Sequence, residues 1–143
     1  MPNGYEVEDV WKARGRGFQM AAIQPSGIVV HLTGQVAWDA EEVIVGAGDV
    51  EQQTRQCFMN ISRLLEEIGG TLGDIVSITT YFTDRAQLPE IQKVRSEFLG
   101  SADAPVSTSV MVAGLGHEDF LVELTPVAVI PESRFRPPAK RLR

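Results

Sequence analysis

Apolar residues before position 49 fall into short runs that are typical of β-strands. The runs cover residues 18–23, 28–33 and 36–38, and the second is rich in β-branched side chains. Pro25-Ser26-Gly27 stands between the first two runs and is a turn signal. The pattern therefore predicts a hairpin of residues 18–23 and 28–33, followed by a short third strand.

The spacing of apolar residues changes to a helical period after residue 49. From Val50 to Ile68, apolar side chains recur every three or four residues, and polar side chains fill most of the opposite side. This pattern indicates an amphipathic helix that packs one side against a core. Asp49 is suited to cap its first turn, and Gly69 is suited to end it in the left-handed conformation.

The rest of the chain predicts a second helix and three more strands. Residues 74–82 alternate and are β-branched, so they predict a strand. A helix is predicted over residues 89–99, because Pro89 suits a first helical turn and Gly100 stops the apolar stripe. Strands are also predicted over residues 106–112 and 120–130.

The predicted order is βββαβαββ, an α+β fold with one mixed sheet. Two helices can cover only one face of such a sheet. The opposite face is expected to be rich in Val, Ile and Leu, and a monomer rarely leaves so large an apolar patch in water. The sequence thus predicts an oligomer in which the bare sheet faces meet.

Length and composition fit one domain. The chain has 143 residues, of which 43% are hydrophobic, and this is enough for a single core. Residues 1–17 form a lead rich in glycine and charge, and residues 18–131 are predicted to form the domain. Residues 132–143 are predicted to be a basic, flexible tail.

Charge is distributed unevenly along the chain. The formal net charge is −6, but five of the 13 basic residues lie within residues 134–143. Residues 1–133 carry eight Lys and Arg against 19 Asp and Glu, so the body would repel a phosphate backbone. The tail could attract nucleic acid, but Phe135 is its only aromatic residue for stacking, which favours a solvated extension. A nucleic-acid partner is therefore not expected.

Several classes of protein are also not expected. The single cysteine excludes an intramolecular disulfide and a cysteine-rich metal site. Residues 1–6 lack the features of a signal peptide, and no apolar run approaches the length of a membrane span. No phosphate-binding loop, dinucleotide fingerprint or zinc-protease motif occurs. We expect a cytoplasmic protein with no membrane partner, metal or cofactor.

Four side chains could carry chemistry, and three of them have a structural interpretation. Cys57 lies on the apolar side of the first predicted helix, which favours a core position over a nucleophile. His31 lies in a predicted strand and favours packing, whereas His117 lies in a loop where solvation competes with a general-base role. Glu123 stands inside an apolar run, so it either points to solvent or serves a site.

The order and spacing of several motifs give the chain a resemblance to a known family. The matching segments are Thr33-Gly34-Gln35, Gln52 or Gln53 with Gln56 and Asn60-Ile61, Gly73-Asp74-Ile75-Val76, and Val122-Glu123-Leu124. Over roughly residues 18–131 the chain resembles the YjgF/Rid family, whose RidA-like members are also called endoribonuclease L-PSP proteins. The resemblance implies a chorismate-mutase-like fold and a homotrimer with small-molecule clefts between subunits.

The resemblance also implies a reaction. Active members of the family hydrolyse 2-imino or enamine acids and release ammonia and a 2-keto acid. Glu123 aligns with the glutamate that positions the attacking water, and Thr33 and Gly34 align with the loop that contacts the substrate. The resemblance thus implies a catalytic role for Glu123.

Three positions depart from the family pattern. Ser107 stands where the family has the arginine that grips the substrate carboxylate, and Ser107 has no charge for that task. Gln92 replaces an asparagine on the second helix, and Arg95 replaces a nearby tyrosine. Arg95 either supplies a displaced cation beside Gln92 and Ser107 or is a solvated or interface residue.

Three hypotheses follow. The first is a Rid-like trimer that binds a small polar metabolite and hydrolyses an imine, an enamine or a related C–N bond, with a substrate other than a simple 2-imino acid. Ser107, Thr33, Gly34 and Gln92 would line its pocket. The second is a non-catalytic trimer for ligand binding or protein interaction. The third is RNA cleavage, which the acidic body disfavours.

Overall fold

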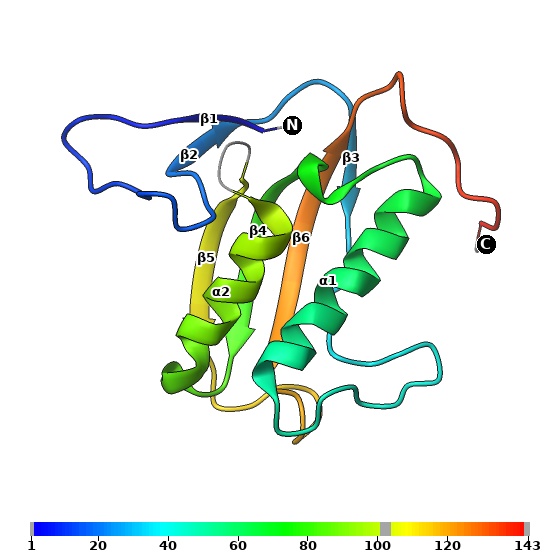
Figure 1. Cartoon of the computed structure of the whole chain (residues 1–143). Helices are drawn as coiled ribbons and strands as arrows, with labels where there is room; N and C mark the ends of the chain where they lie inside the picture. The colour runs from blue at the N-terminus through cyan, green and yellow to red at the C-terminus, as the bar shows by residue number, and fades with distance from the viewer. Residues whose placement is uncertain (1, 101–103, 142–143) are drawn as a thin grey trace.

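Two helices lie on one side of a four-stranded sheet (Figure 1). The computed structural model describes residues 2–100 and 104–141, so the first residue of the predicted lead and the last two of the predicted tail lie outside it. The sheet has the order β3-β6-β4-β5; only β4 and β5 run parallel. Its strands are β3 (Ile28–His31), β4 (Ile75–Phe82), β5 (Val106–Met111) and β6 (Val122–Ile130). The predicted α+β fold with a mixed sheet is confirmed.

Both helices begin and end close to where the sequence predicts. α1 (Val50–Glu67) starts after Asp49, whose side chain accepts a hydrogen bond from the Gln52 backbone N–H. α2 (Leu88–Leu99) stops at Gly100, where φ is 66°. Short 3₁₀ turns precede β4 and α2: η1 (Leu72–Asp74) and η2 (Arg85–Gln87).

The core lies between the helices and the sheet. Phe58 and Leu65 of α1 are fully buried, as is Leu124 of β6. The rings of Phe58 and Phe98 stack with centroids 4.9 Å apart and so join α1 to α2. Each such large side chain stabilises the fold by roughly 1.5–3 kcal/mol when it leaves water.

The predicted N-terminal hairpin is wrong. β2 (Ala21–Ile23) pairs with β1 (Asn3–Tyr5) from the lead in a separate two-stranded sheet, while β3 pairs with β6. The turn between β2 and β3 therefore connects two sheets. Gly27 makes this path possible, because a Cβ there would lie 2.4 Å from the Ile130 carbonyl oxygen.

The predicted third strand is also not a full strand. Around residues 36–38 the structure has only isolated bridges, which join Gln35 to Leu124 and Trp38 to Ile44. Both bridges are antiparallel. This segment instead forms a loop against α1, which is described below.

The face of the sheet away from the helices is mixed in composition. Ile78 and Phe82 of β4 lie on the helix side, so Ser77, Thr79 and Tyr81 face away. The expectation of a face rich in Val, Ile and Leu is wrong for Ile and Leu, because the alternation directs them to the core. By register, the other members of this open face are Val29, His31, Val106, Thr108, Val110, Glu123, Thr125, Val127 and Val129.

The basic tail lies against the C-terminal end of α1. Arg134 donates hydrogen bonds to the buried Asp74 carboxylate and to the Gly69 carbonyl, and Arg136 donates to the Glu66 carbonyl. Cationic side chains at this end of a helix complement its dipole. The flexibility of the tail stays a prediction. No helix within the described residues is both long and apolar enough to cross a membrane.

Candidate functional site

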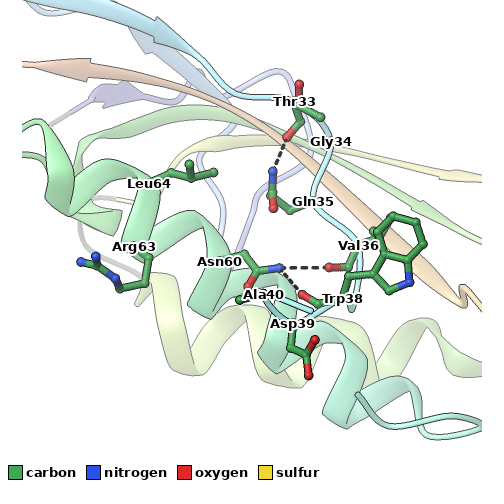
Figure 2. Close-up of a pocket in the computed structure, with 10 residues that line it drawn as sticks. All are labelled: Thr33, Gly34, Gln35, Val36, Trp38, Asp39, Ala40, Asn60, Arg63 and Leu64. Atoms are coloured by element: carbon green, nitrogen blue, oxygen red, sulfur yellow. Dashed lines mark hydrogen bonds between the residues drawn. The ribbon is translucent and has the colours of Figure 1, made fainter. Parts of the chain in front are cut away.

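An open pocket of about 620 Å³ lies between α1 and the loop that follows β3 (Figure 2). Leu64 of α1 is an apolar part of its wall, and the carboxylate of Asp39 and the guanidinium of Arg63 stand at its margin (Figure 2). The Trp38 indole points to the other side of the loop, where its ring lies 5.1 Å from that of Phe120 between centroids (Figure 2). Apolar walls with a few polar groups are typical of small-molecule sites. The full lining is Thr33, Gly34, Gln35, Val36, Trp38, Asp39, Ala40, Asn60, Arg63 and Leu64.

Asn60 holds the loop of this pocket in place. Its Nδ2 donates hydrogen bonds to the Val36 carbonyl at 3.2 Å and the Trp38 carbonyl at 2.9 Å (Figure 2). Gln56 in turn donates to Asn60 Oδ1 at 2.8 Å, which fixes the amide orientation. The loop thus gains the backbone partners that a strand would have supplied.

The loop brings Gly34 against Glu123. The backbone N–H and carbonyl of Gln35 bond to Leu124 at 2.8 and 3.0 Å, so the preceding residue lies beside β6. A Cβ on Gly34 would lie 2.4 Å from Glu123 Oε2, so only glycine fits without displacing the carboxylate. The structure therefore brings together the predicted site residues Thr33, Gly34 and Glu123.

Among the described residues, the Glu123 carboxylate has no cationic partner. In the part of the chain that the structure describes, no lysine or arginine nitrogen lies within 4.0 Å of its oxygens. Glu123 is half-buried on β6 beside the pocket. A carboxylate in this position is able to accept a hydrogen bond from a water molecule or a ligand.

Arg95 and Ser107 form a second group. Arg95 Nη1 donates a hydrogen bond to Ser107 Oγ at 3.1 Å, which places α2 against the start of β5. The Arg95 residue is only 1% exposed, and burial lowers the pKa of its guanidinium. Its burial excludes the interpretation of Arg95 as a solvated residue. The half-buried Gln92 lies one turn earlier on α2.

Within one chain, the residues around Glu123 and those around Arg95 lie on opposite sides of the sheet. Ser107 is paired with Ile78 on the helix side of the sheet, whereas Glu123 is paired with Tyr81 on the open face. The predicted site residues therefore divide into Thr33, Gly34 and Glu123 on one hand and Gln92, Arg95 and Ser107 on the other.

Of the remaining candidates, Cys57 lies in the core and the two histidines are exposed. Burial, and to a smaller extent the charge of Glu123, raises the pKa of Cys57 to about 12, so its thiol stays protonated in the core. His117 Nδ1 accepts a hydrogen bond from the Asp119 backbone N–H at 3.1 Å. His31 is exposed on β3, so the packing role predicted for it is wrong within one copy. Within the described ranges, no group of three or more His, Cys, Asp or Glu could hold a metal ion.

Comparison with known proteins decides the family. A family model described as Endoribonuclease L-PSP matches residues 15–130. The chain belongs to the endoribonuclease L-PSP family. This membership agrees with the resemblance to YjgF/Rid proteins drawn from the motifs.

Individual relatives of this endoribonuclease L-PSP family chain cover most of its length. A RutC family protein of Pyrococcus abyssi is 32% identical over 102 residues, which make up 71% of this chain and 79% of the relative. The solved structure of the Rid family protein YyfB of Yersinia pestis, a protein of unknown function, has 30% sequence identity to this chain and a TM-score of 0.84. The match covers 90% of this chain and 98% of the YyfB chain. The solved structure of a YjgF/YER057c/UK114 family member of Mycobacterium tuberculosis has 27% sequence identity and a TM-score of 0.63. The match covers 74% of this chain and 82% of that chain.

Sequence reasoning on this L-PSP family chain missed the part played by Asn60. Its side chain builds the pocket loop, although the sequence used it only as a motif position. A signal was present, because an asparagine with poor helix propensity stands in the middle of a strongly predicted helix.

Proposed function

We propose that the protein is a Rid-type homotrimer that binds a small polar metabolite in clefts between copies and hydrolyses an imine, an enamine or a related C–N bond there. The observation that carries the proposal is the Glu123 carboxylate, which lies against Gly34 beside the pocket and has no cationic partner among the described residues. Glu123 is the group that places the attacking water.

A cleft between copies would reunite the two groups of site residues. Ser107 and Glu123 lie on opposite faces of the sheet in one chain, so a single copy offers each of them only half of a pocket. A second copy packed against the first can bring its own Arg95 and Ser107 to the Glu123 side. The open sheet face, on which Val29 and Val110 are exposed in a single copy, gives the copies a surface on which to meet.

The proposed reaction needs one base and one water molecule. Glu123 accepts a proton from the water as the water oxygen adds to the imine carbon, and the proton then passes to the nitrogen. The tetrahedral adduct then carries one hydroxyl and one amino group. Glu123 takes the hydroxyl proton and passes it to the amino nitrogen as the C–N bond breaks, so that ammonia leaves and a carbonyl group remains. A positioned carboxylate of this kind contributes about 10²–10⁴-fold to the rate.

The neutral side chain at position 107 affects which substrate the site can bind. A neutral serine hydroxyl cannot replace a charge-assisted fork, in which each hydrogen bond contributes about 1.5–3 kcal/mol. We therefore propose a substrate other than a simple 2-imino acid. The same position favours a second candidate, a trimer that binds a ligand without turning it over.

Turnover with a panel of freshly generated imines tests the proposal. The panel contains 2-iminopropionate and dienelactam-like amides, and ammonia release is measured for wild type and for Glu123→Gln, which keeps the shape of the side chain. We expect hydrolysis of at least one compound, with a loss of about 100-fold or more in the variant. Glu118→Gln, which removes an exposed loop carboxylate, is the matched control and should retain the rate.

Two outcomes would contradict the proposal. If no compound is hydrolysed above background by wild type, the non-catalytic candidate is supported and the hydrolase is rejected. If Glu123→Gln hydrolyses the panel as fast as wild type, Glu123 does not place the water.

A further inference from the structure

Tyr81 lies directly beside Glu123 on the open sheet face. The antiparallel register of β4 and β6 pairs Tyr81 with Glu123, and the two strands are neighbours in the sheet (Figure 1). Directly opposed residues of an antiparallel pair point to the same face, with Cβ atoms about 4.5–5.5 Å apart. Both residues are half-buried. The carboxylate that we propose as the base therefore has a phenol as its immediate neighbour across the ladder.

The Tyr81 hydroxyl is available to a ligand. Within the part of the chain that the structure describes, it forms no hydrogen bond, and it is not one of the buried polar atoms that lack a partner. A hydroxyl that is neither paired nor buried reaches the surface. It also forms no direct hydrogen bond to Glu123, so neither group occupies the other. A phenol hydroxyl donates one hydrogen bond and is thus able to bind an acceptor atom.

The other polar side chains of the open face lie farther from Glu123. Thr79 and Thr125 form the next pair along the ladder on this face, two residues or about 7 Å away. His31 and Ser77 are both in register with a β6 residue four positions from Glu123, which corresponds to about 13 Å. By register, the phenol is therefore the hydrogen-bond donor of the open face that lies nearest to this carboxylate.

We infer that the Tyr81 hydroxyl donates a hydrogen bond to the nitrogen of the bound imine, and that Tyr81 is thus a second catalytic residue beside Glu123. This inference rests on the proposed function and deepens it, because it requires a ligand whose uncharged nitrogen accepts a hydrogen bond. The hydrogen bond draws electron density away from the C=N carbon, which favours addition of the water that Glu123 holds. The phenol proton stays on Tyr81 throughout, since the nitrogen receives its protons from the water by way of Glu123.

This role also fits the neutral side chain at position 107. Recognition through the nitrogen places the reacting C=N bond between the phenol and the carboxylate, and it does so without a charged group on the ligand. Orientation by one donor and one base on the same sheet face is a common way to gain rate. The expected substrate class is therefore an uncharged imine.

The chain has only two tyrosines, which makes a direct test possible. The full chain is labelled with ¹³C at the tyrosine carbon that bears the hydroxyl, and Tyr5→Phe and Tyr81→Phe assign the two signals. The probe is 2-methyl-1-pyrroline, a stable cyclic imine, at a pH above its own pKa so that it is uncharged. The control is 1-methylcyclopentene, a ring of the same shape without nitrogen. We expect the imine alone to shift the Tyr81 signal in a saturable manner and to leave the Tyr5 signal in place.

The two tyrosine variants test the hydroxyl itself. Tyr81→Phe keeps the ring, so it should fold as wild type does, bind the imine about three- to tenfold more weakly, and no longer distinguish it from the hydrocarbon. Tyr5→Phe, which alters an exposed residue of the lead, is the matched control and should bind as wild type does. In the ammonia assay, Tyr81→Phe should lower kcat about tenfold or more, because a donor to the reacting group is lost.

Several results would reject the role of Tyr81. These are no binding of the imine, saturation by the imine without movement of the Tyr81 signal, and equal affinity of Tyr81→Phe and wild type for the imine. Failure here is separable from failure of the hydrolase. Imine binding at Tyr81 without turnover of any compound in the panel would reject only the hydrolase, whereas turnover that Tyr81→Phe retains at the full rate would reject only the role of Tyr81.

Discussion

Single residues at the pocket depend on each other through contacts that span the chain. Position 34 needs a glycine because a Cβ there would collide with the carboxylate of Glu123, 89 positions later in the chain. The backbone conformation of Gly34 does not itself require a glycine, since its φ is not among the positive values. The atom that a Cβ would meet is the end of a flexible side chain, Glu123 Oε2. The fold can tolerate such a contact by moving the carboxylate, whereas a reaction that needs the carboxylate in place cannot.

Substitution of Gly34 should therefore affect function more than stability. In Gly34→Ala we expect the free energy of unfolding to fall by about 1 kcal/mol, because the Glu123 side chain must shift. In the Glu123→Ala background the same substitution should cost almost nothing, since the clash is gone. Urea unfolding of the four proteins measures this coupling. Equal costs in both backgrounds would mean that Gly34 is required for another reason.

Cys57 gives a residue-scale prediction for pH. Burial, with a smaller contribution from the Glu123 charge, raises its pKa to about 12 in the folded protein, against about 8.5 in an unfolded chain. The thiol therefore contributes stability that is fully present below about pH 8.5 and is lost as the pH rises toward 12. We expect the difference in unfolding free energy between wild type and Cys57→Ala to shrink over this range. A difference that stays constant would contradict a buried, protonated thiol.

At the scale of elements, the sequence predicted what local pattern determines. Asp49, Gly69 and Gly100 act within a few residues, so the ends of both helices could be located. The apolar stripe of α1 is buried for the most part, but Leu64 is 49% exposed and lines the pocket. The partner of β2 could not be predicted, because β1 lies in a segment that reads as a charged lead. The hydrogen bond between Arg95 and Ser107 depends on how α2 sits on β5, which no local pattern encodes. Motif matching located Glu123 and Gly34 but not the opposite faces on which the two groups of residues lie.

The end of α1 gives an element-scale prediction. Asp74 is 1% exposed, and its carboxylate receives hydrogen bonds from the Thr71 backbone and from Arg134 of the tail. Arg134→Ala should lower the free energy of unfolding by about 1 kcal/mol, because the tail loses an attachment. It should also speed amide exchange at Ala139, whose backbone N–H donates a hydrogen bond to Glu67 Oε1 at 2.9 Å. Thermal unfolding and hydrogen exchange measure the two effects. The matched control is Lys140→Ala, an exposed residue of the same tail, and equal effects in both variants would contradict the role of Arg134.

At the scale of the whole molecule, the open sheet face carries side chains that a single copy leaves exposed, among them Val29 and Val110. It is less apolar than the sequence suggested, since Ser and Thr alternate with Val and Tyr along β4 and β5. Such a mixed surface fits an interface that combines packing with hydrogen bonds. The open face and the division of the site residues between the two sides of the sheet therefore support a trimer more strongly than the apolar area does.

Sedimentation at micromolar concentration tests the trimer. We expect wild type to sediment as three copies, and Val110→Glu, which places a charge on the open face, to shift the protein toward single copies. Val43→Glu adds the same charge at an exposed loop position away from the sheet and should remain a trimer. A wild type that sediments as a single, stable copy would reject the interface and the clefts with it.

The position of β6 in the sheet also bears on how the molecule is made. β6 lies between β3 and β4 and is the later of each pair in the chain, so β3 has no neighbour in its sheet until residues 122–130 have left the ribosome. Loop closure over so long a separation slows folding. The nascent chain thus carries a β3 with unpaired edges through most of its synthesis, a stage at which a holding chaperone would have an extended apolar segment to bind.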